Sequence, residues 1–128
     1  AEYDGPSQIR GFTAAPRGTG YPSQTMLAQT WSKQLAYQFG LSYGSDMGTL
    51  NVSGTWAPGC NIHRSPFGGR NFEYYSEDTF LTSEMAYNAS RGFKNTGRYV
   101  YLKHFVLNDM DVCGCTHGVA NKHYVKHI

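Results

Sequence analysis

The sequence predicts an α/β protein with a parallel β-sheet. Two observations carry this prediction. Segments of strand-like composition alternate with segments whose apolar residues recur at helical spacing, and long polar loops follow the predicted strands. In α/β barrels the loops after the strands hold the active site. We therefore expect the functional residues of this chain in its long loops.

The first third of the chain is predicted to contain an extended loop followed by one helix. Residues 3–25 carry glycines and prolines among polar residues, which is typical of a loop without regular structure. Loops longer than about 12 to 15 residues are uncommon in compact domains unless they build a site. Ser23 or Thr25 can cap the helix that follows. Its apolar residues recur at helical spacing until Gly40 or Gly44.

The middle of the chain predicts a strand, a loop and a helix. The β-prone segment 49–57 is short and is stopped by a Pro-Gly pair. A second long loop covers residues 61–78. It leads into a helix that begins at about Ser76 or Thr79 and continues to Phe93.

The strongest strand signal in the chain lies in residues 99–106. β-Branched and aromatic side chains occupy nearly every position of this segment, so we expect a strand that is buried on both faces. Residues 108–118 read as a polar loop, and a further helix is predicted over residues 120–128.

The composition favours one folded unit with a thin core. The chain has 128 residues, of which 16% are charged and 15% aromatic. Leu, Ile, Val and Phe together make up only about 18% of the residues. The net charge is +2 and the basic residues are scattered, so neither a nucleic acid nor an acidic membrane surface is an expected partner. No apolar run approaches the ~18 residues that a membrane span needs.

The cysteines favour a reducing, cytoplasmic compartment, because three cysteines, two of them separated by one residue, form no disulfide framework. The tail of the chain resembles a metal site, with Cys113, Cys115, His117, His123 and His127. Structural zinc sites usually place about two to four residues between cysteines and about a dozen before the histidines. This spacing differs, so we expect no metal and no cofactor, with zinc binding by the tail as the alternative.

The loop at residues 61–78 concentrates charge in a chain that has little of it. Its acidic, basic and histidine side chains are His63, Arg64, Arg70, Glu73, Glu77 and Asp78. Arginine presents a planar fork of donors and a carboxylate accepts two hydroxyl protons, which suits the vicinal hydroxyls of a sugar or a carboxylate substrate. The alternative is a loop that uses these charges in salt bridges to hold its own shape.

A second candidate is the Lys103-His104 pair near the carboxyl end of the last predicted strand. A charged pair is costly at a buried position unless it faces a polar cavity. In α/β barrels this end of a strand carries ligand contacts. The alternative is that Lys103 extends into solvent and His104 binds a carbonyl of the core.

Three motifs follow one another along the chain. They are Asp4-Gly5-Pro6, then Trp56-Ala-Pro-Gly-Cys-Asn-Ile-His-Arg-Ser-Pro-Phe-Gly-Gly-Arg-Asn-Phe-Glu-Tyr-Tyr-Ser-Glu-Asp78, then Lys103-His-Phe-Val-Leu-Asn-Asp109. Together they resemble the N-terminal barrel domain of glycoside hydrolase family 3, the β-glucosidase family. The resemblance implies that residues 1–128 form a single partial domain, an incomplete (β/α)8 TIM-type barrel of about half the full barrel with long loops after its strands.

The resemblance also implies a function and a set of site residues. It predicts a retaining β-glycosidase that binds a β-glucoside or a related sugar, with Asp4, Arg70, Lys103 and His104 as binding residues for the sugar hydroxyls. The supporting residues would be Arg64, Glu73, Glu77, Asp78 and Asp109. Hydrogen bonds from such groups can strengthen as the sugar ring distorts toward an oxocarbenium-like state.

The chain departs from the family pattern in its catalytic residues. The family nucleophile is an Asp on a later barrel strand and the acid/base carboxylate usually comes from a second domain, so the catalytic residues are unknown in this chain. After Asn108 and Asp109 the family usually continues with Glu-Thr-Asn-Arg, where this chain has Asp111-Val-Cys-Gly.

Two functions remain open at this point. The chain is either part of a β-glucosidase that needs the remainder of its parent enzyme, or a sugar-binding or scaffold module without catalysis. A half barrel exposes open sheet edges, so we expect homo-oligomers or marginal stability.

Overall fold

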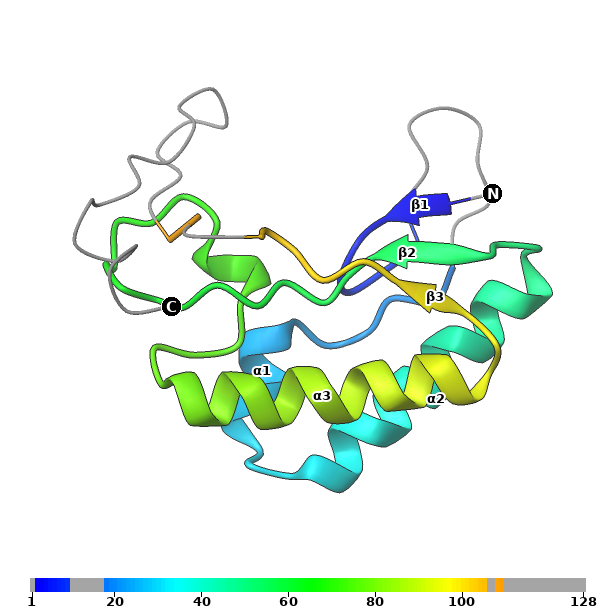
Figure 1. The fold of residues 1–128 in the computed structure, drawn as a ribbon, viewed down its shortest axis with the longest axis horizontal. Helices are drawn as coiled ribbons and strands as arrows, with labels where there is room; N and C mark the ends of the chain where they lie inside the picture. Colours follow the sequence, from blue (N-terminus) through cyan, green and yellow to red (C-terminus); the bar gives the residue numbers. More distant parts are fainter. Residues whose placement is uncertain (1, 10–17, 106–107, 110–128) are drawn as a thin grey trace.

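The chain folds as a small parallel sheet that is covered by helices. The computed structural model describes residues 2–9, 18–105 and 108–109. Their elements are β1 (Glu2–Asp4), α1 (Gln24–Gln29), α2 (Lys33–Thr49), β2 (Gly54–Trp56), a 3-10 turn (Asn71–Glu73), α3 (Thr79–Asn95) and β3 (Tyr99–Val100). The strands pair in parallel in the order β1-β2-β3, and in Figure 1 the helices lie on one side of this sheet. The predicted α/β class is confirmed.

The register of the strands divides their side chains between two faces. Tyr3, Thr55 and Val100 are register partners, and Tyr3 and Val100 pack against the core that the helices form. Side chains alternate along a strand. The neighbouring positions, which include the register partners Asp4 and Trp56, therefore lie on the face away from the helices.

The first segment contains a strand where the sequence predicted only a loop. Residues 2–4 form β1, which pairs with β2 along its whole length. The prediction was wrong because the glycines and prolines that indicate a loop begin only at Gly5, and pairing with a distant strand leaves no local signal. The helix after the loop begins at Gln24, and Ser23 caps it by accepting a hydrogen bond from the Met26 N–H.

The single helix predicted to end at Gly40 or Gly44 is two helices, α1 and α2. The chain turns between them at Trp31, whose φ of 53° is left-handed. Ser32 then caps α2, which continues to Thr49. The prediction missed the break because apolar residues recur at helical spacing on both sides of it. The two glycines are packing positions inside α2 and do not end it.

The structure contains both the strand and the helix predicted for the middle of the chain, with bounds that differ by a few residues. β2 covers Gly54–Trp56, which is shorter than the predicted segment 49–57 because Thr49 still belongs to α2. α3 begins after Asp78, whose carboxylate accepts a hydrogen bond from the Leu81 N–H at 2.6 Å. Gly97, with a φ of 75°, follows the end of α3.

The expectation that the strand of residues 99–106 is buried on both faces was wrong. β3 covers only Tyr99–Val100, and the side chains of Tyr99 and Leu102 are 67% and 57% exposed. The physical reason is that, in the part of the chain that the structure describes, helices cover only one face of the sheet, and Tyr99 lies on the other face. The predicted loop at residues 108–118 lies largely, and the predicted helix at 120–128 entirely, outside the described residues.

The core depends on close packing between α2 and α3. Their buried side chains include Tyr43, Met47, Met85 and Phe93. A Cβ on Gly40 would lie 2.1 Å from the Ala89 carbonyl oxygen, so the two helix backbones meet there without side chains between them. Among the described residues, no helix is long and apolar enough to cross a membrane.

We expect Gly40→Ala to destabilise the fold, because the added methyl group meets the backbone of α3. Alanine favours a helix over glycine by about 1 kcal/mol, and overpacking of this kind costs about 1 to 3 kcal/mol or more. Because the methyl group would lie 2.1 Å from a backbone atom, the cost should be near the upper end, and the net loss in the free energy of unfolding should be about 2 kcal/mol, measured by urea denaturation.

Gly48→Ala is the matched control on the same helix. Its Cβ would meet only the flexible end of Arg98, at 3.2 Å, so this variant should be as stable as the wild type or slightly more stable. A Gly40→Ala variant as stable as Gly48→Ala would contradict the packing described above.

Candidate sugar-binding site

The residues predicted to bind sugar meet in one cavity beside the carboxyl ends of the strands. The cavity has a volume of about 380 Å³. It is lined by Asp4, Trp56, Arg70, Tyr101, Leu102, Lys103 and His104. Four of these were predicted from the sequence, and they come from segments up to 100 residues apart. Parallel strands explain the meeting, since their carboxyl ends lie at one edge of the sheet.

A network of ion pairs connects three of these segments. The Lys103 ammonium lies 2.7 Å from Asp4 Oδ1 and 3.3 Å from Glu73 Oε2. The other carboxylate oxygen of Glu73 accepts a hydrogen bond from Arg70 Nε. Glu73 is only 4% exposed, and a buried carboxylate needs such partners to offset its loss of hydration. The network therefore fixes the positions of the Arg70 and Lys103 side chains.

His104 is held by neighbours on two sides. Its backbone N–H donates to Asn61 Oδ1 at 2.7 Å, and its ring Nδ1 lies 3.0 Å from the hydroxyl oxygen of Tyr74. Burial lowers the pKa of His104, and the nearby Arg70 charge lowers it further. The imidazole is therefore neutral at pH 7 and can both donate and accept hydrogen bonds.

A buried glutamine holds the loop that follows β2. The Gln24 side chain donates to the Gly59 carbonyl at 2.7 Å and accepts from the Gly59 N–H at 3.0 Å. A Cβ on Gly59 would lie 2.7 Å from the Glu73 carbonyl oxygen, so only glycine fits between these segments. On its other side, Gly59 forms a bridge with Lys103. α1 thus positions the backbone on which the site is built.

The remaining predicted residues take different places. Arg64 pairs with Asp109 at 3.1 Å and connects the loop to the segment after β3. Asp78 caps α3, and Glu77 is exposed in the turn before it. Of the predicted supporting residues, Glu73 lies against the Arg70 side chain.

Several residues of the site were missed by the sequence analysis. Tyr74 lies between His104 and Asn108, whose carbonyl oxygen accepts from the Tyr74 hydroxyl at 3.1 Å. Trp56 lines the cavity beside Asp4. The signal for Trp56 was available, because an aromatic residue at the end of a strand, directly before a long polar loop, lies where the site was expected.

The described part of the chain offers no group of three or more His, Cys, Asp or Glu side chains that could hold a metal ion. The tail residues considered above, Cys113, Cys115, His117, His123 and His127, lie outside the described residues.

Sequence relatives of the chain are β-glucosidases. It is 39% identical over 112 residues to the β-glucosidase A of Butyrivibrio fibrisolvens, a match that covers 84% of this chain and 13% of that protein. It is 42% identical over 105 residues to the thermostable β-glucosidase B of Acetivibrio thermocellus, covering 82% of this chain and 14% of the relative. The chain thus spans about one seventh of the length of these relatives.

Solved structures give the same result. The β-glucosidase 3B of Thermotoga neapolitana in complex with glucose matches with a TM-score of 0.78 and 37% identity, over 85% of this chain and 16% of that one. A β-glucosidase from Paenibacillus barengoltzii matches with a TM-score of 0.82 and 37% identity, over 87% of this chain and 12% of that one. The family profile of the glycosyl hydrolase family 3 N terminal domain matches residues 7–127. The chain belongs to glycosyl hydrolase family 3.

Proposed function

We propose that this chain forms part of the sugar-binding subsite of a retaining β-glucosidase. The observation that carries the proposal is the convergence of Asp4, Arg70, Lys103 and His104 on one cavity. The relatives are named β-glucosidases, and one of the similar structures holds glucose. A terminal β-glucosyl residue is therefore the ligand that we assign to this cavity.

The four side chains offer complementary hydrogen bonds to a sugar. Asp4 is more than one-third exposed and keeps acceptor capacity beside its contact with Lys103. Arg70 and Lys103 are charged donors, and neutral His104 offers its ring Nε2, because its Nδ1 already contacts the Tyr74 hydroxyl. Charge-assisted hydrogen bonds are about twice as strong as neutral ones, so these groups can hold a ring while it distorts toward an oxocarbenium-like state.

The carboxylates of the site are binding and supporting groups in this proposal. Asp4 and Glu73 contact Lys103, and Asp109 contacts Arg64. Retaining hydrolysis needs two carboxyl groups about 5 to 5.5 Å apart, one of them able to attack. We assign both to the remainder of the parent enzyme, so that this chain binds the sugar and does not cleave it.

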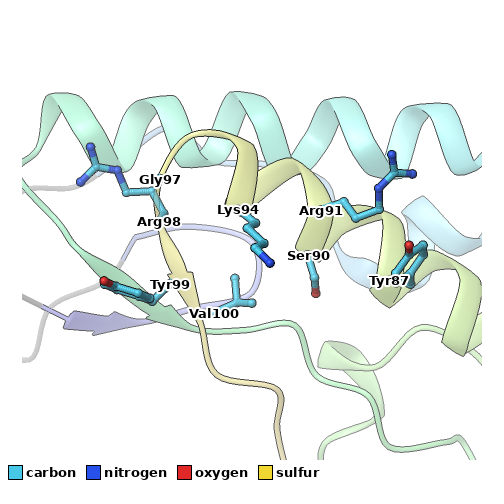
Figure 2. A pocket seen from close by; sticks show the side chains of 8 residues that line it. All are labelled: Tyr87, Ser90, Arg91, Lys94, Gly97, Arg98, Tyr99 and Val100. Carbon is cyan, nitrogen blue, oxygen red and sulfur yellow. The ribbon is translucent and has the colours of Figure 1, made fainter.

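We also propose that residues 1–128 form one partial domain, an incomplete barrel of which this sheet is one side. Two features support this. β3 is an edge strand in the described structure, and a groove of about 580 Å³ runs between α3 and β3. Figure 2 shows Ser90 and Lys94 extending from α3 toward Val100 of β3 in this groove. A further strand and helix of a barrel would fill this space.

The alternative function is a sugar-binding or scaffold module that self-associates without catalysis. The exposed aromatic side chains beside the groove favour association between copies, because large apolar patches are rare on monomers. Both functions require the same sugar site, and they differ in what covers the open side of the sheet.

The first prediction concerns sugar binding by the chain as it exists. Glucose titration followed by NMR should show saturable binding, and p-nitrophenyl β-glucoside should not be hydrolysed. Asp4→Asn and Arg70→Ala should each weaken binding about tenfold or more, since hydrogen bonds to charged groups contribute about 1.5 to 3 kcal/mol. Arg91→Ala, an exposed arginine of α3, is the matched control and should leave affinity unchanged. Wild-type protein that binds no sugar would rule out the site.

The second prediction concerns the protonation of His104. Its pKa is lowered by burial and by Arg70, so the imidazole C–H signals in an NMR titration should move with a midpoint below 6.5. Arg70→Ala removes one of the two positive charges that lower the pKa of His104 and should raise this midpoint. A midpoint above 6.5 in the wild type would mean that His104 is not held in the polar cluster as described.

The third prediction concerns association. Sedimentation velocity should show oligomers that increase with protein concentration. Tyr99→Lys places a charge on the open edge and should favour the monomer, whereas Leu35→Lys, on α2 away from that edge, should not. A wild-type chain that stays monomeric at all concentrations and melts at high temperature would contradict the incomplete barrel.

A further inference from the structure

Trp56 is an aromatic residue of the cavity to which no role has been assigned. It ends β2 and is the register partner of Asp4 on β1, so the two side chains lie on the same face of the sheet. It lines the cavity together with Arg70, Lys103 and His104. It is 47% exposed, although it lies in the middle strand of the sheet. The exposed area of this indole therefore faces the space where the hydroxyl-binding groups converge.

The charged side chains of the cavity can bind the hydroxyls of a sugar, but they offer no apolar surface to the faces of its ring. A pyranose ring presents hydroxyls at its edge and C–H groups on its faces, and the faces gain free energy when they leave water against an apolar surface. Binding pockets combine a few placed polar groups with apolar and aromatic walls. Asp4, Arg70, Lys103 and His104 provide the polar groups.

The other aromatic residue of the cavity is already engaged. The Tyr101 hydroxyl donates to Glu2 Oε1 at 2.6 Å, which joins β3 to β1 across the middle strand. Gly54 permits this crossing, since a Cβ there would lie 3.2 Å from Tyr101 Cε2. Trp56 lies two residues after Gly54 on the same face of β2. It is next to the Asp4–Lys103 ion pair.

We propose that Trp56 is the apolar platform of the sugar subsite, against which one face of the bound pyranose ring packs. The inference rests on the proposed function and deepens it, because it adds a binding residue that selects for ring shape. The platform favours rings with an uninterrupted C–H face, such as gluco- and xylo-configured pyranoses. It gives no advantage to an acyclic polyol that carries the same hydroxyls.

The two tryptophans of the chain allow a direct test. Trp31 lies in the turn between α1 and α2 and is 72% exposed, and it does not line the cavity. In a Trp31→Phe variant all indole emission comes from Trp56, and glucose should change its intensity or shift it to shorter wavelength in a saturable way. In the matched Trp56→Phe variant the remaining emission comes from Trp31 and should not respond to glucose.

Affinity measurements give the second readout. Trp56→Ala should weaken glucose binding about fivefold or more, because the variant loses most of the apolar surface offered to the ring. Trp31→Ala should leave it unchanged. Sorbitol, the acyclic polyol, should bind Trp56→Ala and the wild type equally weakly. The emission experiment stands independently if Trp56→Ala fails to fold.

The outcomes separate this inference from the function on which it rests. Suppose that glucose binding is lost in Arg70→Ala, but that it does not change Trp56 emission and is not weakened in Trp56→Ala. This result would overturn the platform and leave the proposed function in place. A wild-type chain that binds no glucose by NMR would overturn both.

Discussion

The buried carboxylate of Glu73 is the interaction on which the rest of the site depends. Burying an isolated carboxylate costs several kcal/mol, and removing one partner of a buried pair typically costs about 3 to 5 kcal/mol. Glu73 avoids this cost only while Arg70 and Lys103 both stay against it. Since Lys103 also contacts Asp4, one buried charge fixes the relative positions of the loop after β2, the segment after β3 and the end of β1.

That arrangement needs a backbone that lets the segments approach one another. Gly59 provides the approach, because any side chain there would collide with the Glu73 carbonyl oxygen. Gln24 then binds both polar groups of the Gly59 peptide from α1, so the loop is held without regular secondary structure. A buried amide that satisfies a backbone in this way is costly to lose, since both of its partners would be left without hydrogen bonds. The helices thus support the site, although they contribute none of the groups that face the cavity.

Sequence patterns predicted the class of fold and the cluster of charge, but not the interactions between distant strands. The cap at Ser23 and the centre of α3 have local signals, and the structure contains both. β1 was missed because its strand character arises from pairing with β2, and the break at Trp31 was missed because apolar spacing continues through it. For the site, residue types and their positions pointed to Arg70, Lys103 and His104, and Asp4 was predicted from the family resemblance. Tyr74 joins the site through the path of the loop, which no local pattern contains. Trp56 had a local signal that was overlooked, since it is an aromatic residue at the end of a strand before a long polar loop.

The pairing of the carboxylates with cations determines whether they can act as nucleophiles or only as binding and supporting groups. An attacking carboxylate must be free to approach a carbon atom, whereas Glu73 and Asp109 are held against cations. A neutral His104 near the cationic side chains of Arg70 and Lys103 suits hydroxyl recognition, because its Nε2 can form a hydrogen bond with a hydroxyl without adding a positive charge to the cluster. In the proposed function, binding and chemistry are therefore separate. The ion-paired cluster holds the ring, and its binding energy is available to a reaction carried out by carboxylates on other segments of the parent enzyme.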